Sequence, residues 1–226
     1  MTFTYYGHSC FAIEVNRVNL LFDPFVGYNP LAKDIDVDSI EADFILVSHG
    51  HQDHVADAVS IAKRTGATII CSWELMEWFA KQGVQNLHPM NTGGKKTFSF
   101  GTVRCVVAQH SSGLPDGSYG GNPMGFVVTT ADGNFYYAGD TALTLDMQLI
   151  PRWTTIDFAV LPIGDNFTMG AEDAAMAADM VQTQKVIGVH YDTFPYIVID
   201  KHQAEKVFHE HQIELILPSI GESFGI

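Results

Sequence analysis

Apolar residues recur along the chain in short runs that are separated by polar or glycine-containing turns, and this pattern predicts many strands. Early strand-like runs lie at 2–6, 10–15, 18–22 and 44–47. Later ones lie at 68–71, 98–100, 103–108, 126–130, 135–138, 158–161, 186–189 and 215–217. Several runs are apolar at consecutive positions, which is typical of strands that are covered on both faces.

Helical patterns are interspersed among these strands, at about 55–64, 74–81, 171–181 and 201–209. Helices in this order can cover the faces of a central sheet. We therefore expect a layered α/β architecture with the sheet inside and the helices outside. No stretch rich in Pro, Ser or charge divides the chain, and no repeat with a period of about 20–50 residues occurs. One domain that covers residues 1–226 is the simplest expectation.

The composition is that of a soluble globular protein, because 46% of the residues are hydrophobic and 17% are charged. No run of about 18 apolar residues occurs, so no membrane insertion is expected. Residues 1–11 lack the basic, apolar and small-residue segments of a secretory signal. The expected compartment is the cytoplasm.

The charge balance is acidic, with 12 Lys and Arg against 26 Asp and Glu and a net charge of −14. A chain of this sign repels phosphate backbones, so we expect a small-molecule substrate and no nucleic-acid partner. The pair Lys95-Lys96 is interpreted as a solvated strand edge. The three cysteines lie in or beside apolar runs and are interpreted as reduced packing residues. The pattern leaves open whether the protein forms a homo-oligomer.

The strongest chemical signal follows the run 44–47 directly, in the segment Ser48-His49-Gly50-His51-Gln52-Asp53-His54. Neutral imidazole and carboxylate groups bind zinc, manganese and ferrous iron. Four such groups within six residues on a tight turn can surround one ion or a pair of ions. A polar turn that only caps a helix does not need three histidines. The segment therefore predicts a metal site.

Three further runs also end in a residue of ligand type: 103–108 leads to His110, 135–138 to Asp140 and 186–189 to His190. In open α/β sheets, functional groups gather outside the carboxyl ends of the strands. We therefore expect four strand ends to bring His49 together with these three residues in one cleft.

The cluster from His49 to His54, with His110, Asp140 and His190 after it, resembles the metallo-β-lactamase superfamily over nearly the whole chain. The segments 7–9, 21–24, 161–164 and 189–195 are similar to a branch of small metal-dependent hydrolases. That branch is similar to the ascorbate-6-phosphate lactonases and to the phospholipase D that releases N-acylethanolamines. The resemblance implies an αββα sandwich, in which two mixed β-sheets carry helices on their outer faces.

The resemblance also implies two divalent metal ions, with zinc or manganese favoured and iron as a further option. A metal-bridging hydroxide would be the nucleophile, and Asp53 would orient it and later protonate the leaving group. Carried over position by position, the first ion would be held by His49, His51 and His110, the second by Asp53, His54 and His190, and both by Asp140.

We therefore expect a dinuclear hydrolase that cleaves an ester-like bond, of a lactone or a phosphodiester, in a small molecule. One alternative is a mononuclear iron enzyme of sulfur oxidation from the same superfamily. Another is a binding protein that retains a relict metal site. The uncharged Gln52 disfavours the diiron flavoprotein branch, which has a metal-binding carboxylate at that point.

Three more residues are candidates for the surroundings of the metal site. Asp23 ends the run 18–22 and could accept a hydrogen bond from a ligand histidine. His8, in a Gly-His-Ser turn, and Asp165, after an apolar run, could line the cleft. The glycine-rich segment 111–123 is a candidate lid over the substrate.

Overall fold

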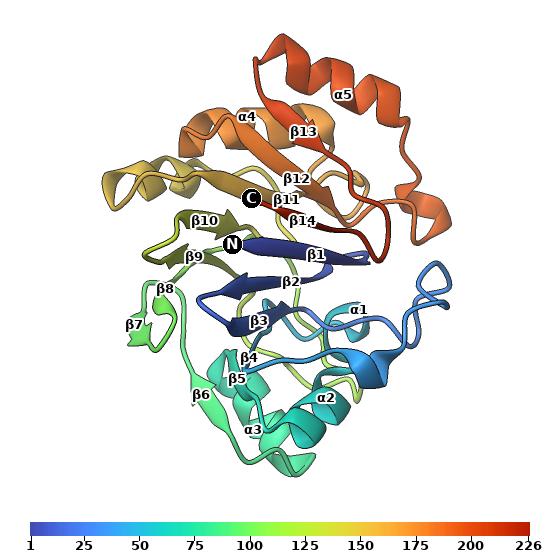
Figure 1. The fold of residues 1–226 in the computed structure, drawn as a ribbon, viewed down its shortest axis with the longest axis vertical. Helices are drawn as coiled ribbons and strands as arrows, with labels where there is room; N and C mark the ends of the chain where they lie inside the picture. Colours follow the sequence, from blue (N-terminus) through green and yellow to red (C-terminus); the bar gives the residue numbers. More distant parts are fainter.

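The computed structural model describes residues 1–226, and its strands form two seven-stranded sheets that face each other (Figure 1). The first sheet has the order β14-β1-β2-β3-β4-β5-β6. Neighbours from β14 to β3 pair antiparallel and those from β3 to β6 pair parallel. Its strands are β1 (Thr2–Gly7), β2 (Cys10–Val15), β3 (Val18–Phe22), β4 (Phe44–Leu46), β5 (Thr68–Cys71), β6 (Leu87–Pro89) and β14 (Ser223–Gly225).

The second sheet has the order β13-β12-β11-β10-β9-β8-β7 and is also mixed. Neighbours from β7 to β10 pair antiparallel and those from β10 to β13 pair parallel. Only β14 leaves the order of the chain, since it returns to the first sheet beside β1 (Figure 1). The strands are β7 (Lys95–Phe98), β8 (Gly101–Val107), β9 (Met124–Thr129), β10 (Asn134–Tyr137), β11 (Phe158–Pro162), β12 (Lys185–Val189) and β13 (Glu214–Ile216).

Helices cover the outer face of each sheet, which confirms the predicted αββα sandwich (Figure 1). An apolar cluster joins α2 and α3 to the first sheet, and another joins α4, α5 and η2 to the second. Ser72 and Asp200 cap α3 and α5 by accepting backbone hydrogen bonds. The helices are α1 (Gln52–Val55), α2 (Ala58–Thr65), α3 (Trp73–Lys81), α4 (Ala171–Val181) and α5 (Lys201–Glu210), with 3-10 turns η1 (Val37–Ser39), η2 (Leu145–Arg152) and η3 (Pro195–Ile197).

Aromatic side chains fill the space between the two sheets. Phe11 and Phe22 of the first sheet stack with ring centroids 4.5 Å apart, and Phe22 meets Phe135 of the second sheet at 5.9 Å. All three are fully buried, and each such side chain stabilises the fold by about 1.5–3 kcal/mol. This packing fixes the two sheets relative to each other, and with them the strand ends that both sheets present.

The predicted helix at 55–64 is two helices, α1 and α2, separated at Ala56 and Asp57. The buried Asp57 carboxylate accepts hydrogen bonds from the backbone N–H groups of Val26 and Gly27, at 2.6 and 3.0 Å. The Asp57 N–H donates to the carbonyl of Pro24. These contacts change the direction of the chain between α1 and α2. The hydrophobic periodicity of the sequence does not predict them.

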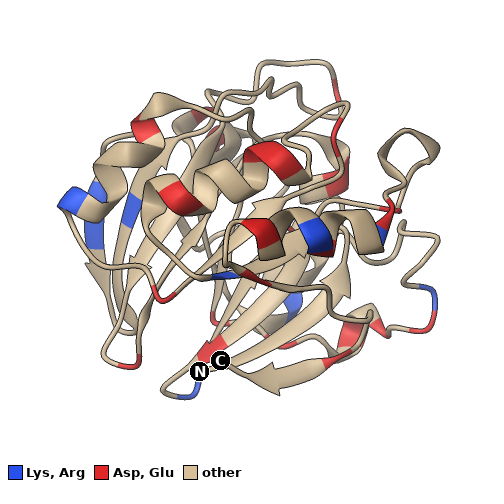
Figure 2. Cartoon of the chain, turned by 90° about the horizontal axis from the view of Figure 1, so that it is seen from above, with Lys and Arg blue, Asp and Glu red and all other residues tan.

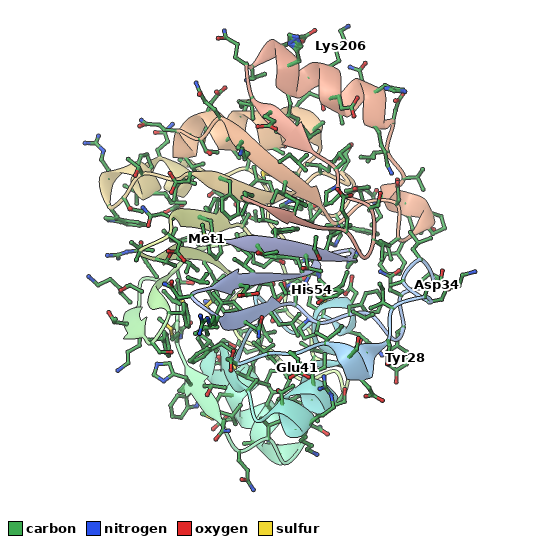
Figure 3. The ribbon with its side chains drawn as sticks, viewed as in Figure 1. Met1, Tyr28, Asp34, Glu41, His54 and Lys206 are labelled. Carbon is green, nitrogen blue, oxygen red and sulfur yellow. The ribbon has the colours of Figure 1, made fainter.

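The three cysteines and the lysine pair lie in the environments that the sequence predicts. Cys10, Cys71 and Cys105 are free and buried, and Lys95 and Lys96 lie exposed on the edge strand β7. No helix has both the length and the apolar character that a membrane span requires. Acidic side chains outnumber basic ones over the helices in Figure 2. In Figure 3, His54 lies inside the molecule, whereas Lys206 lies on the outside.

Candidate metal centre

Six strand ends deliver polar side chains to one edge of the sandwich. In the first sheet, β1 and β3 run in the same direction because both pair antiparallel with β2, and β4 pairs parallel with β3. In the second sheet, β8 and β10 both pair antiparallel with β9, and β10, β11 and β12 pair parallel. Their carboxyl ends therefore meet at one edge of each sheet. The residues that follow these strands are His8, Asp23 and His49 from the first sheet, and His110, Asp140 and His190 from the second.

Asp140 lies at the centre of the cluster and is almost completely buried. Its Oδ2 atom lies 2.9 Å from His190 Nε2 and 3.2 Å from His54 Nε2. The same oxygen lies 3.7 Å from His110 Nε2 and 3.9 Å from His49 Nε2. Four imidazole nitrogens from three separate segments thus converge on one carboxylate oxygen.

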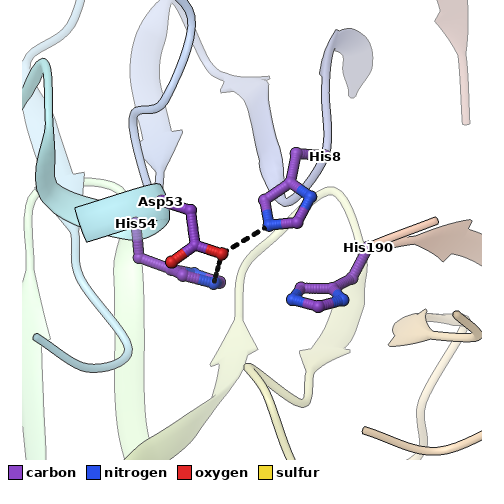
Figure 4. A group of neighbouring side chains, drawn as sticks. All are labelled: His8, Asp53, His54 and His190. Carbon is purple, nitrogen blue, oxygen red and sulfur yellow. Dashed lines mark hydrogen bonds and ion pairs between the residues drawn. The ribbon is translucent and has the colours of Figure 1, made fainter. Parts of the chain in front are cut away.

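Two groups of potential ligands adjoin this carboxylate. The first group is His49, His51 and His110, whose nitrogens lie within 4.8 Å of one another. The second group is Asp53, His54 and His190, whose atoms meet the same limit, together with His8 (Figure 4). The structure therefore brings together all seven residues that were expected to hold metal.

The buried Asp23 orients His54. Its Oδ2 atom accepts a hydrogen bond from His54 Nδ1 at 2.8 Å, and it also accepts from the hydroxyls of Ser48 and Tyr137, each at 2.5 Å. Its Oδ1 atom accepts from the Ser48 N–H at 2.7 Å. Because Asp23 takes Nδ1, the nitrogen of His54 that faces Asp140 is Nε2, and this atom is the one that would bind a metal.

His8 plays a corresponding part for Asp53. His8 Nε2 lies 3.0 Å from Asp53 Oδ2 (Figure 4). His8 Nδ1 lies 3.0 Å from the Thr193 hydroxyl. Burial and the nearby His190 lower the pKa of His8 to about 4, so the ring is neutral near pH 7. An ionised carboxylate has no proton to give, so Nε2 donates to Asp53 and Nδ1 accepts from Thr193.

Two glycines permit the close approach of these segments. Gly139 precedes Asp140 with φ of +63°, and a Cβ atom there would lie 2.9 Å from Ser48 Cβ. A Cβ atom at Gly50 would lie 3.1 Å from Leu114, while the Gly50 N–H donates to the Ser112 hydroxyl at 3.0 Å. Larger residues would push the strand ends apart.

Left-handed backbone conformations also gather at this edge. His8, Asp23, His190 and Asp192 have φ of +56°, +40°, +57° and +62°. Such conformations cost of order 1–3 kcal/mol each for residues with a side chain. The His190 N–H donates to the His8 carbonyl at 2.9 Å, which joins two of these turns. The fold thus spends stability here to aim side chains into the cluster.

The charge environment differs between the two groups. Burial lowers the pKa of His49, His51 and His110, with neighbouring histidines acting in the same direction. Burial also opposes charge on His54, yet Asp140, Asp23 and Asp53 together raise its pKa well above the usual value. The first group is therefore neutral near pH 7, which is the state that binds metal, whereas a metal must displace a proton from His54.

The hydrogen-bond network tests whether these residues fit a metal ion. His49 Nδ1 donates to the Ser48 hydroxyl at 3.0 Å, and His51 Nε2 lies 3.3 Å from the Ser111 hydroxyl. That leaves His49 Nε2 with a lone pair, and this atom lies only 2.9 Å from His51 Nδ1. In addition, His54 Nε2 and Asp140 Oδ1 are buried without a hydrogen-bond partner. Imidazole nitrogens and a carboxylate that converge in this way fit a divalent cation.

A cavity of about 220 Å³ opens beside the cluster. Candidate ligands from both groups line this cavity. Its other walls are a hydroxyl and two aromatic rings. The lining residues are His51, Asp53, His110, Ser111, Asp140, Phe167, His190 and Phe194.

Asp165, the segment 111–123 and two further histidines lie outside the ligand cluster. Asp165 is exposed in a turn where its carboxylate accepts from the Asn166 N–H, and it lines a neighbouring cavity. The segment 111–123 is anchored, since the Ser72 hydroxyl donates to the Gly120 carbonyl and the Trp78 ring N–H donates to Asp116. His202 pairs with Glu205, and His211 pairs with Asp179.

Three residues of the site were absent from the sequence-based expectations. Thr193, which supports His8, and the cavity-lining Phe167 and Phe194 lie in turns after β11 and β12. In the sequence, these residues are marked only by their closeness to the ends of strands. Closeness to a strand end does not show which side chain of the turn faces the cavity.

Comparison with known proteins agrees with this arrangement. A sequence profile described as the beta-lactamase superfamily domain matches residues 18–191. A UPF0173 metal-dependent hydrolase of Christiangramia forsetii is 50% identical over 227 residues, with all of both chains covered. A UPF0173 metal-dependent hydrolase of Listeria monocytogenes is 44% identical over 230 residues, again with full coverage of both.

Solved structures share the fold. Igni18, a metallo hydrolase of the archaeon Ignicoccus hospitalis, has a TM-score of 0.87 and 30% identity, and the match covers 100% of this chain and 98% of Igni18. An isothiocyanate hydrolase from Delia radicum gut bacteria has a TM-score of 0.81 at 21% identity, with 100% and 99% covered. The second likeness is one of fold alone.

Proposed function

Because this chain belongs to the UPF0173 metal-dependent hydrolases of the metallo-β-lactamase superfamily, we propose that it hydrolyses an ester-like bond in a small molecule with the help of two divalent ions. The favoured bonds are those of a lactone or a phosphodiester. His49, His51 and His110 would hold one ion, Asp53, His54 and His190 the other, and Asp140 both.

The observation that carries this proposal is the convergence of imidazole nitrogens around Asp140. Seven ligand groups exceed what a single tetrahedral or octahedral ion uses with room for a water. Both groups adjoin the same carboxylate oxygen, one through His110 and His49 and the other through His54 and His190. This arrangement favours a dinuclear site over the mononuclear alternative.

Bound divalent ions would activate a water near neutral pH and polarise the oxygen of the bond under attack. The chain's own contribution is to orient the groups around them. Asp23 fixes the tautomer of His54, and His8 holds Oδ2 of Asp53 in place. The Asp53 side chain is about a quarter exposed and lines the cavity.

Asp53 is the group best placed to handle a proton. Burial opposes its ionisation, yet His54 and the hydrogen bond from His8 lower its pKa far below the usual range. The carboxylate is therefore ionised near neutral pH and can take a proton on Oδ1, since Oδ2 accepts from His8. In the proposed reaction it accepts the proton of the attacking water and returns it to the leaving group.

The experiment is a metal analysis joined to a hydrolase screen. Metal-stripped protein is reconstituted with zinc, manganese or ferrous iron, and each form is tested on lactones, phosphodiesters, thioesters and β-lactams. We expect hydrolysis only in metal-loaded protein, and an acidic limb in kcat/KM with a pKa near ~7. The matched variant His88→Ala, which alters a histidine outside the cluster, should behave as the unaltered protein. Hydrolysis that survives exhaustive chelation of verified metal-free protein would overturn the proposal.

A further inference from the structure

The cavity beside the ligand cluster offers an unusual set of walls for a substrate. Apart from the proposed ligands, its lining consists of the Ser111 hydroxyl and the rings of Phe167 and Phe194. No lysine or arginine lines it. A charged phosphate or carboxylate arm on the substrate would therefore find no cationic side chain to bind.

The nearby cation Lys201 is already engaged. Its Nζ atom pairs with Asp192 at 3.2 Å and lies 5.2 Å from the centre of the Tyr191 ring. Both of those partners belong to the segment that follows His190. Lys201 therefore offsets a local carboxylate and does not serve as an anchor for an anionic group.

The space next to the cavity is acidic. A second cavity of about 520 Å³ is lined in part by Asp165, Glu172 and Asp200. Tyr196 also lines this second cavity, and the centre of its ring lies 6.0 Å from that of Phe167, which lines the first cavity. Carboxylates at this place repel an anionic extension of the substrate and are compatible with a neutral one.

Phe167 and Tyr196 form an aromatic rim that is apolar and exposed. The exposed fractions of Phe167 and Tyr196 are 51% and 74%, and the two rings contact each other at the mouth between the cavities. Large aromatic side chains that remain exposed beside a polar reaction centre mark a place where apolar ligand surface is covered. A cavity of about 220 Å³ has room for a group of roughly the size of one ring or a short alkyl chain.

We infer that the substrate is an uncharged carbonyl ester or lactone whose non-reacting part is a small apolar group packed against Phe167 and Phe194. The inference rests on the proposed hydrolase function and narrows it, because it separates neutral carbonyl esters from phosphorylated or carboxylated compounds. The aromatic rim and the missing cation thus set specificity, while the ligand cluster is the reaction centre.

The experiment compares two esters that differ only at the end of the acyl chain. These are para-nitrophenyl butyrate, which ends in a methyl group, and para-nitrophenyl hemisuccinate, which ends in a carboxylate; bis(para-nitrophenyl) phosphate is the anionic diester. On metal-loaded protein, kcat/KM for the butyrate should exceed that for the hemisuccinate by about 10-fold or more. Faster turnover of the hemisuccinate or of the phosphate would overturn the inference while leaving the proposed hydrolysis intact.

The variant Phe167→Ala tests the rim directly. It should raise KM for the butyrate about 5–10-fold, leave KM for the hemisuccinate unchanged and leave the metal content unchanged. The control is Trp153→Ala, because Trp153 is an exposed aromatic residue that covers Arg104 away from the cluster. An unaltered butyrate KM in Phe167→Ala would contradict the inference.

A binding measurement keeps the inference testable without turnover. The amides N-phenylbutyramide and N-phenylsuccinamate resemble the two esters but resist hydrolysis, and their binding can be followed by calorimetry. The neutral amide should bind about 10-fold more tightly, and Phe167→Ala should abolish the difference. If no ester is hydrolysed by metal-loaded protein, the proposed function fails, whereas equal binding of the two amides would overturn the inference itself.

Discussion

The two ligand groups are supported in different ways. In the first group, the supports of His49 and His51 are the hydroxyls of Ser48 and Ser111, each next in sequence to a candidate ligand. In the second group, Asp23 supports His54 from 31 residues away and His8 supports Asp53 from 45 residues away. The second group also contains a carboxylate and is more deeply enclosed, since both His54 and His190 are buried, whereas His49 alone is buried in the first group.

This difference shows which part of the centre depends on the whole fold. Both groups draw residues from the two sheets, but Asp23 contacts His54 directly and reaches His49 only through the Ser48 hydroxyl. Asp23 is itself hydrogen-bonded across the sandwich by Tyr137 of β10, so damage to the packing between the sheets should affect the second group more strongly. The following predictions test this asymmetry, from the largest expected effect to the smallest.

Replacing the shared carboxylate should remove the distinction between the groups. Asp140→Ala should lower kcat/KM by at least about 1,000-fold and reduce the occupancy of both ions, because one carboxylate oxygen adjoins ligands of each. Metal content by mass spectrometry and turnover on the best substrate provide the measurement. If only one ion is lost, Asp140 does not serve both groups.

Removing the support of His54 should damage the second group more than the first. Asp23→Ala should weaken the affinity for one of two ions about 10–100-fold and the affinity for the other ion less, because Asp23 reaches His49 only through Ser48. It should also lower the free energy of unfolding of metal-free protein by about 2–4 kcal/mol, because buried donors lose their acceptor. Stepwise metal titration and denaturant unfolding measure the two effects. Equal weakening of both ions would contradict the proposed asymmetry.

The groups should differ in their response to pH. The lowered pKa values of His49, His51 and His110 keep the first group neutral at pH 6–8, so its metal affinity should change little there. His54 has a raised pKa and holds a proton that metal must displace, so affinity at the second group should rise about tenfold per pH unit. Metal titrations at several pH values test this, and parallel slopes for both ions would refute it.

Loss of the hydrogen bond from His8 to Asp53 should have the smallest effect on activity. His8→Phe removes the donor to Asp53 Oδ2 and should lower kcat about 10-fold, whereas His8→Gln retains an N–H group and should recover part of the loss. Both variants should be compared in metal-free protein by thermal unfolding. A purely structural role for His8 would lower stability and activity together, without recovery by glutamine.

The sequence predicted the candidate ligands of both groups better than their surroundings. The spacing from His49 to His54 is local, so the motif was visible without any knowledge of the fold. His110, Asp140 and His190 were expected from strand ends and from the superfamily resemblance, and the parallel directions of β8, β10 and β12 bring them together. Consecutive apolar runs predicted covered strands in a layered α/β fold, whereas the superfamily resemblance implied their arrangement in two sheets.

Features that depend on turns were not predictable in this way. The donor role of His8 toward Asp53 requires a left-handed turn at His8 and the return of the chain at Thr193. The aromatic wall at Phe167 follows two successive positive-φ residues, Asp165 and Asn166, that no hydrophobic pattern signals. Strand β14 escaped notice because it has three residues and pairs with β1 from the other end of the chain.

The most direct test of the proposed dinuclear centre is the number of metal ions per chain, followed during graded chelation. We predict about two divalent ions per chain in saturated protein, lost in two separate steps, with the step of the second group shifted further than the other step in Asp23→Ala. A single ion per chain in saturated protein, unaffected by His54→Ala or His190→Ala, would contradict the account.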